Sequence, residues 1–208
     1  MTDWRSIAAV PGADGQPRCG WCLGSPDYEA YHDYEWGRPV VDDTKIFEKL
    51  CLEAFQSGLS WLTILRKREN FRRAFRGFDP RTVASFGADD VDRLLEDSSI
   101  VRNRAKIEAS IANARATLQV QRDRGSLADL VWAFAPARRD RAAPETLGTV
   151  ASRTPESTAL AKALKEYGFR FVGPTTAYAA MQSLGLVNDH LAGCHVREDC
   201  EREARTVS

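Results

Sequence analysis

Cysteine and histidine residues gather near the two ends of this 208-residue sequence. One cluster holds a Cys-x-x-Cys pair with a histidine ten residues further on, and the other holds a histidine and a cysteine four residues apart. Thiolates and imidazoles are the ligands of tetrahedral zinc, and a spacing of four places two ligands on one face of a helix. The two clusters therefore favour a metal site that joins the ends of the chain. The possible ligands are Cys19, Cys22, His32, His190, Cys194, His195 and Cys200.

Spacing alone leaves open which of these residues bind a metal, and two other interpretations stay open as well. Cysteine is a common small residue of protein cores, so the thiols could be unligated. A site with only three protein ligands would keep a position for water and could serve a zinc hydrolase. Five cysteines, an odd number, in a chain without a secretory signal argue against disulfides and for a cytoplasmic protein.

A single acidic residue and a group of aromatic residues form the second chemical feature. Glu53 lies at the edge of the apolar stripe of an expected helix, so we expect its carboxylate to be partly desolvated. Aromatic rings with polar tips suit the stacking of a flipped base, although they suit an ordinary core equally well. These rings are Trp21, Tyr28, Tyr31, Tyr34, Trp36 and Trp61.

The segment from Gly168 to Thr176 lies between two expected helices. Two glycines permit a tight hairpin, and Pro174 suits the first position of the second helix. Free amides at such a helix start can hold a phosphate, as in a helix-hairpin-helix that grips the DNA backbone. A plain turn between helices would show the same pattern. We place the hairpin unit at about residues 156–184.

The elements that must position these residues are helical. Helical spacing of apolar residues and capping residues predict helices at about 42–57, 61–75, 80–85, 89–96, 101–122, 125–134, 154–167, 174–184 and 187–195. Strand-like alternation is nearly absent, so we expect an all-α protein. Residues 1–17 are expected to form a flexible arm, 18–195 the main domain and 196–208 a tail.

The chain has 29 basic and 29 acidic residues, so its net charge is zero and DNA binding would need local patches of positive charge. The apolar runs of the sequence are too short for a membrane span.

Together these residues resemble the DNA-3-methyladenine glycosylase I family. The resemblance covers about residues 18–195 in collinear order. The matching stretches are Cys-Gly-Trp at 19–21, Tyr-His-Asp-Tyr-Glu-Trp-Gly at 31–37, Leu-Glu-Ala-Phe-Gln-Ser-Gly-Leu-Ser-Trp at 52–61, Lys-Arg-Glu-Asn at 67–70, Phe-Val-Gly-Pro-Thr-Thr at 171–176 and Gly-Leu-Val-Asn-Asp-His at 185–190.

The resemblance implies a two-lobed helical enzyme of the helix-hairpin-helix glycosylase superfamily. Such an enzyme flips 3-methyladenine from alkylated double-stranded DNA, hydrolyses its N-glycosidic bond and releases the free base, with no strand cleavage. It implies one structural zinc per chain and a monomer. The implied site residues are Glu53 as the acidic residue of the base pocket, Trp61 as its stacking partner, Trp21, Tyr28 and Tyr31 as pocket walls, Cys19, His32, His190 and Cys194 as zinc ligands, and Gly168, Gly173 and Thr175 as contacts to the DNA backbone.

Two positions qualify this interpretation. Phe55 stands where some relatives have glutamine, a difference expected to change the rim of the pocket. Asp189 lies near the place where related glycosylases carry a catalytic aspartate, and we treat it as a second, weaker catalytic candidate beside Glu53. The main rival function is a non-catalytic DNA-binding module that uses the hairpin and the zinc as a clamp.

Overall fold

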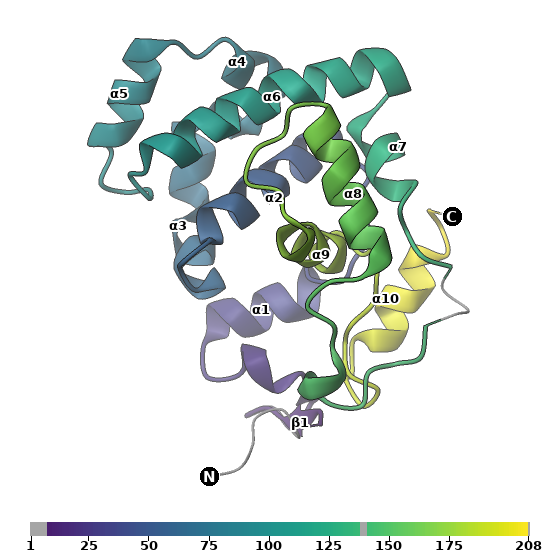
Figure 1. Cartoon of the computed structure of the whole chain (residues 1–208). Coiled ribbons are helices and arrows are strands. Elements are labelled where there is room, and N and C mark those ends of the chain that lie inside the picture. The colour runs from purple at the N-terminus through teal and green to yellow at the C-terminus, as the bar shows by residue number, and fades with distance from the viewer. Residues whose placement is uncertain (1–7, 138–140, 208) are drawn as a thin grey trace.

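The computed structural model describes residues 8–137 and 141–207, and these residues are almost entirely helical (Figure 1). The all-α prediction is confirmed, because the described residues hold ten α-helices and only one two-stranded hairpin. The helices are α1 (Pro26–Tyr34), α2 (Asp43–Gln56), α3 (Trp61–Ala74), α4 (Pro80–Ala84), α5 (Ala88–Glu96), α6 (Arg104–Arg124), α7 (Leu127–Trp132), α8 (Pro155–Glu166), α9 (Pro174–Ser183) and α10 (Arg197–Ala204), with strands β1 (Val10–Pro11) and β2 (Pro17–Arg18) and short 3-10 helices η2 (Gly20–Cys22), η3 (Arg76–Phe78) and η5 (Leu147–Thr149).

Polar caps start several of these helices where the sequence predicts them. The Asp42 carboxylate accepts a hydrogen bond from the Lys45 amide at 2.9 Å, and the Ser60 hydroxyl accepts one from the Thr63 amide at 3.2 Å. Each cap satisfies a backbone N–H group that the first helical turn leaves without a partner. These caps fix where α2 and α3 begin, and therefore where Glu53 and Trp61 lie.

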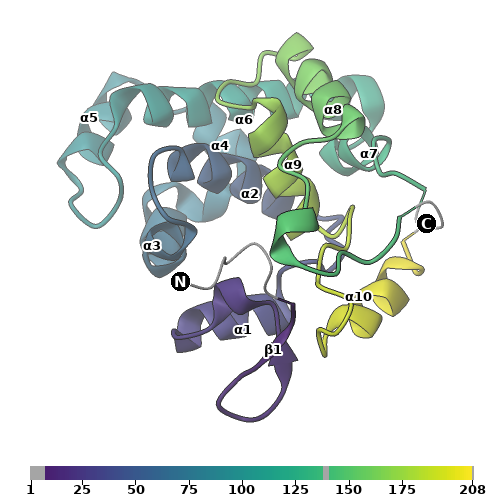
Figure 2. The same ribbon diagram turned by 60° about the horizontal axis from the view of Figure 1, so that its bottom comes forward.

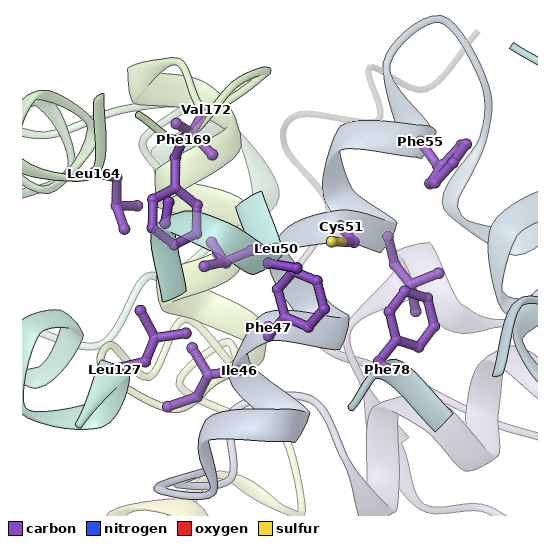
Figure 3. Close-up of a cluster of buried hydrophobic side chains, with 14 of the residues drawn as sticks. Ile46, Phe47, Leu50, Cys51, Phe55, Phe78, Leu127, Leu164, Phe169 and Val172 are labelled. Carbon is purple, nitrogen blue, oxygen red and sulfur yellow. The ribbon is translucent and has the colours of Figure 1, made fainter. Parts of the chain in front are cut away.

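Helices α2 and α9 form the centre of the molecule and pack against each other. Helix α8 packs against α9 to form the predicted helical hairpin, and α6 runs across α2 and α4 (Figure 1). The apolar stripe of α2 is buried against α7, η3 and the α8–α9 hairpin, as Figure 3 shows for Phe47, Leu50 and Phe169. Glu53 is thus held on a helix that the core fixes along its length.

The two terminal segments lie together as a second lobe (Figure 2). Residues 10–17, which we expected to belong to a flexible arm, form an antiparallel hairpin with Arg18 instead, and residues 1–7 lie outside the described residues. The hairpin is held by the buried Arg18, which donates to Asp33 at 2.8 Å and to Asp14, and by the His195 amide, which donates to the Pro17 carbonyl at 2.9 Å. The expected tail at 196–208 contains α10. The limits of the 18–195 domain stay a prediction.

The helix expected at 187–195 is absent, and this prediction was wrong. Side chains replace helical hydrogen bonds there: the His190 amide donates to the Asn188 side chain at 3.3 Å, and the Leu191 amide donates to the Cys19 sulfur at 3.3 Å. A tight turn from the Cys194 amide to the Leu191 carbonyl, at 2.9 Å, closes the segment. His190 and Cys194 therefore meet across a turn and not on a helical face.

Helix α1 was not among the predicted helices. Its buried face is made of Tyr31, His32 and Asp33, so the aliphatic stripe that reveals a helix in a sequence is missing. None of the helices in the described part of the chain combines the length and the apolar character that a membrane span requires.

Candidate active site and metal centre

Cys19, His32, His190 and Cys194 form one buried group in the second lobe. Their ligand atoms all lie within 4.8 Å of one another. The Cys194 sulfur is 3.5 Å from both His32 Nε2 and His190 Nδ1, and the two histidine nitrogens are 3.2 Å apart. Such a set of two sulfurs and two nitrogens is a donor set for tetrahedral zinc. The structure therefore brings together the four ligands that the resemblance implied.

The second nitrogen of each histidine is already engaged outside the group. His32 Nδ1 lies 2.7 Å from an Asp33 carboxylate oxygen, and His190 Nε2 lies 2.9 Å from the Trp36 carbonyl oxygen. These contacts leave His32 Nε2 and His190 Nδ1 facing the sulfurs, which is the arrangement that metal-binding histidines adopt in proteins. The residues present fit a four-coordinate metal ion.

The other possible ligands lie outside the group. The Cys22 thiol donates to the Cys19 carbonyl at 3.1 Å, and His195 Nε2 lies 3.3 Å from Asp33. Cys200 is buried and its sulfur lies 4.0 Å from the Trp36 carbonyl. Burial raises the pKa of the Cys200 thiol to about 11, so this thiol stays protonated at neutral pH.

A cavity of about 570 Å³ opens beside the metal group, between the second lobe and helices α2, α3 and α9. It is lined by every residue that the resemblance assigned to a base pocket. Its walls come from η2, α1, α2, the start of α3, the 147–152 segment and α9. Residues on its surface include Trp21, Tyr28, Tyr31, Trp36, Glu53, Gln56, Trp61, Leu147, Val150, Gln182 and Asp189.

Glu53 is the acidic residue of α2 that lines this cavity, and its side chain is buried, with 6 % exposed. In the described residues no group hydrogen-bonds with its carboxylate or forms an ion pair with it. Burial raises the pKa of Glu53 from its usual 4.5 to about 7, and the positive charge of Lys49 acts in the opposite direction. Glu53 is therefore a desolvated acceptor that faces a cavity and lacks a protein partner.

The aromatic residues surround this carboxylate as an interlocked wall. The Trp21 ring lies edge-on to Tyr28 at 4.9 Å and to Trp36 at 5.1 Å, and the Tyr31 and Trp61 rings are 5.4 Å apart. Trp61 is 7 % exposed, and its Nε1–H group is buried without a hydrogen-bond acceptor in the described residues. The cavity thus combines flat apolar surfaces with one unpaired donor and one unpaired acceptor.

The metal group and the aromatic wall are in direct contact. Trp21 lies edge-on to His32, with ring centroids 5.3 Å apart, and Trp36 lies edge-on to His190 at 4.6 Å. Trp21 also follows the ligand Cys19 by two residues. The four ligands therefore determine where one wall of the cavity stands.

Asp189 lines the same cavity, but its carboxylate is fully engaged. One oxygen accepts from Tyr178 at 2.6 Å and from Gln182 at 2.9 Å, and the other accepts from Arg141 at 2.5 Å. Asp189 is 3 % exposed. These contacts make Asp189 an anchor between α9 and the segment that begins at Arg141, and they leave Glu53 as the carboxylate with free acceptor positions.

Of the two glycines in the hairpin between α8 and α9, only one has the left-handed backbone that favours glycine in a tight turn. Gly168 has φ +93° and ends α8, with the Phe169 amide donating to the Leu164 carbonyl at 3.0 Å. Gly173 precedes α9 with φ −87°, and no side chain caps this helix. Thr175 lies exposed in its first turn. The amides at the start of α9 are therefore free to bind an anion.

Comparison with known proteins identifies the family. Residues 21–198 match the sequence profile of the methyladenine glycosylase family. The chain belongs to this family. It is 50 % identical over 177 residues to DNA-3-methyladenine glycosylase 1 of Escherichia coli, covering 85 % of this chain and 95 % of that protein. It is 46 % identical over 177 residues to the DNA-3-methyladenine glycosylase of Haemophilus influenzae, covering 85 % and 96 %.

Solved structures of this family share the fold as well. The structure that describes 3-methyladenine recognition by 3-methyladenine DNA glycosylase I of Staphylococcus aureus superimposes with a TM-score of 0.81 at 35 % identity, and covers 86 % of this chain and 96 % of that chain. The match extends over most of both chains, so the helical fold of this chain is that of the methyladenine glycosylases.

One expectation within the family framework was wrong. Phe55 does not reach the rim of the pocket, because its side chain is fully buried with its ring 4.6 Å from that of Phe71 (Figure 3). It follows Glu53 by two residues and so points to the opposite side of α2.

Sequence analysis also missed two positions that support the site. Asn113 of α6 accepts a hydrogen bond from the Arg170 amide at 2.7 Å and donates to the Arg170 carbonyl at 3.2 Å, which fixes the hairpin. Lys49 lies beside the Tyr31 and Trp61 rings. An asparagine or a lysine within a helical sequence carries no signal of such contacts, which join elements far apart in the chain.

Proposed function

We propose that this chain is a DNA glycosylase that removes 3-methyladenine from alkylated double-stranded DNA and leaves an abasic site. The observation that supports this function is the unpaired Glu53 carboxylate inside an aromatic cavity of about 570 Å³. The cavity is large enough to admit a purine base, and the relatives of this chain are named for this activity. The cavity takes the base once it has been flipped out of the duplex.

The chemistry requires little from the enzyme beyond recognition. Methylation at N3 places positive charge on adenine, so the base is already a good leaving group. Glu53 accepts hydrogen bonds from the edge of the purine, and the Trp61 ring stacks on its electron-poor face. Water attacks the sugar as the glycosidic bond breaks, and the carboxylate stabilises the positive charge that develops there. Trp21, Tyr28 and Tyr31 form the walls of the cavity that receives the base.

The metal group has a structural role in this proposal. Cys19, His32, His190 and Cys194 hold one Zn²⁺ per chain, and with four protein ligands the ion keeps no position for a water molecule. Bound zinc supplies a crosslink between the terminal segments. The protein's own residues, from Glu53 to the aromatic wall, perform the reaction.

We also propose that the enzyme does not cleave the DNA strand. Strand cleavage by a glycosylase requires an amine that attacks the sugar, and no lysine of the described residues lines the cavity. The α8–α9 hairpin, with Gly168, Gly173 and Thr175, binds the phosphates next to the flipped nucleotide. We expect a monomer, since the hairpin and the cavity both belong to one chain.

Release of methylated purines from methylated DNA tests the function directly. We expect the wild type to release 3-methyladenine preferentially and Glu53→Gln to be reduced by about 100-fold, the size of a lost contact to developing charge. Glu48→Gln is the matched control, because Glu48 is buried on the same helix but pairs with Arg72 outside this cavity. The rival DNA-binding module predicts no release by folded, zinc-loaded wild type. Release that survives in Glu53→Gln would move the key contacts elsewhere.

A further inference from the structure

Lys49 is a half-buried residue that the recognition chemistry above does not use. It lies on α2 four residues before Glu53, which is one helical turn. Its Nζ atom donates to the Tyr31 hydroxyl at 2.8 Å and lies 4.1 Å from the centre of the Trp61 ring. Lys49 does not line the base cavity. It lines a neighbouring cleft of about 390 Å³, and Tyr31 lines both spaces. The lysine therefore stands behind the wall against which a base would stack.

The carboxylates nearest to Lys49 in the cleft are paired with other residues. Glu35 accepts from Arg68 at 2.8 Å, and Glu48 forms an ion pair with Arg72 at 2.8 Å. In the described residues no carboxylate lies within ion-pair distance of Lys49. Lys49 thus brings an uncompensated positive charge to the back of the base cavity, and Glu53 is the uncompensated negative charge on its front.

We propose that Lys49 is a positioning residue that keeps Glu53, on the other side of the aromatic wall, in its anionic form. This inference rests on the proposed function of the cavity. Its electrostatic part concerns Glu53 alone and can be tested without DNA. The hydrogen bond to Tyr31 and the position of the ammonium over one face of Trp61 hold the charge behind this wall, and they leave the opposite face of the Trp61 ring for a base.

Glu53 and Lys49 each shift the pKa of the other in the direction that this role requires. Burial raises the pKa of Glu53, and the Lys49 charge lowers it. Burial lowers the pKa of Lys49, and the Glu53 charge raises it. Each charge therefore favours the ionised form of the other across the aromatic wall.

Most other charged groups that line the two spaces are paired, among them Arg38 with Glu203 in the cleft and Asp189 with Arg141 in the cavity. Helix α3 and the end of α1 contribute Arg68 with Glu35, α2 and α3 contribute Glu48 with Arg72, and α2 contributes the exposed Lys45 at the mouth of the cleft. On the α1 side, burial raises the pKa of both phenols that face Glu53, so they are uncharged near neutral pH. These phenols are Tyr28 and Tyr31. Removal of Lys49 therefore changes the local charge by one unit that no neighbour replaces.

The proposal predicts a loss of function that is confined to low pH. Without Lys49, Glu53 becomes protonated at higher pH, and a protonated carboxyl accepts hydrogen bonds poorly from a purine edge. At higher pH Glu53 is ionised with or without Lys49. The Lys49 charge behind Trp61 also repels a base that is itself positively charged. Removal of Lys49 therefore does not weaken binding of the base at higher pH. A purely structural role for Lys49 would reduce activity at every pH.

A carbon-13 NMR titration of the Glu53 carboxyl group in the intact protein tests the electrostatic part, with the signal assigned by its absence in Glu53→Gln. We expect Lys49→Met, which keeps the length of the side chain and removes its charge, to raise the pKa of Glu53 by about one unit. Lys49→Arg keeps the charge and should restore most of the wild-type value. Lys45→Met removes a lysine from the same cleft one turn away and should leave Glu53 unchanged. An unchanged pKa of Glu53 in folded Lys49→Met would overturn the proposal.

Base release measured across the same pH range tests the link to function. The acidic side of the Lys49→Met profile should move to higher pH by about one unit, which is an approximately tenfold loss at a pH below the wild-type midpoint. On the alkaline side its rate should stay within about twofold of wild type. A uniform loss at all pH values, shared by Lys49→Arg, would contradict the proposal. If the wild type releases no base, the proposed function fails, while the NMR titration still decides whether Lys49 controls Glu53.

Discussion

At the scale of single residues, the site depends on a carboxyl group that is buried without a hydrogen-bonding partner. Burial of a charge is costly. For Glu53 this cost is offset only in part, by the positive charge of Lys49 one helical turn away. Asp189 shows the contrast, because three donors satisfy its carboxylate and fix it as a structural anchor. A residue kept in an unfavourable state at a cavity is one that the function requires and that stability alone would not retain.

Replacement of Glu53 by glutamine should therefore stabilise the protein at alkaline pH. The folded-state pKa of about 7 lies above the usual 4.5, so the favourable contribution of protonated Glu53 is complete below about pH 4.5 and is lost as the pH rises through 7. Glutamine cannot ionise, so Glu53→Gln should exceed wild type at pH 8 by on the order of 2 kcal/mol, with a smaller difference at pH 5. Urea denaturation at the two pH values measures this. Glu145→Gln, at an exposed position, should show no such difference. A variant that is less stable than wild type at pH 8 would contradict the assignment.

At the scale of elements, the α8–α9 hairpin is positioned by backbone geometry and by one clamp from α6. Gly168 supplies the left-handed backbone that ends α8, and Asn113 binds both backbone groups of Arg170. The result is a helix start with free amides, held at a fixed place on the helix whose later residues line the cavity. A hairpin that moved freely could still bind phosphate, but it could not align the flipped nucleotide with Glu53.

The two glycines of the hairpin should respond differently to alanine. Gly168→Ala places a side chain at φ +93° and should cost about 1–2 kcal/mol of stability. Gly173→Ala is the matched control, because φ is −87° and the added methyl group meets no atom within 4 Å, so its effect should stay within about 0.5 kcal/mol. Thermal denaturation of both variants makes the comparison. Equal losses in the two would show that the left-handed backbone at Gly168 is not what determines the hairpin.

At the scale of the whole molecule, the metal group joins segments that are 171 residues apart, from Cys19 to His190. The same two segments are also joined by the ion pair between Arg38 and Glu203 and by the hydrogen bond from the His195 amide to the Pro17 carbonyl. We expect a metal ion bound by such distant residues to restrict the unfolded chain strongly and to fix the aromatic wall that contacts both histidines. The stability of the second lobe and the shape of the base cavity should therefore be coupled.

Loss of the metal should lower the melting temperature and disturb the cavity. We expect one zinc per chain by elemental analysis, and a decrease of about 10 °C on chelation or in Cys194→Ser. Cys22→Ser removes a buried thiol that lies outside the group, so it should keep its zinc and lose only a few degrees. Retention of zinc by Cys194→Ser together with its loss from Cys22→Ser would overturn the ligand set.

Much of the helical framework was predictable from local patterns in the sequence. The Asp42 cap and the apolar stripe of α2 are local signals, and they predicted where Glu53 would lie and that it would be partly desolvated. The spacing of cysteines and histidines identified seven possible metal ligands but could not choose among them. Resemblance to a family chose the four that the structure brings together.

Only the tertiary structure decided the contacts between elements. It placed His190 and Cys194 across a turn where a helix was expected, engaged Asp189 with Arg141, and brought Lys49 behind Trp61. Each of these contacts depends on how distant segments pack. Helix periods and caps are determined by neighbours a few residues apart, so they can be read along the chain. The state of a buried charge is determined by whichever groups the fold places around it, and no local pattern records them.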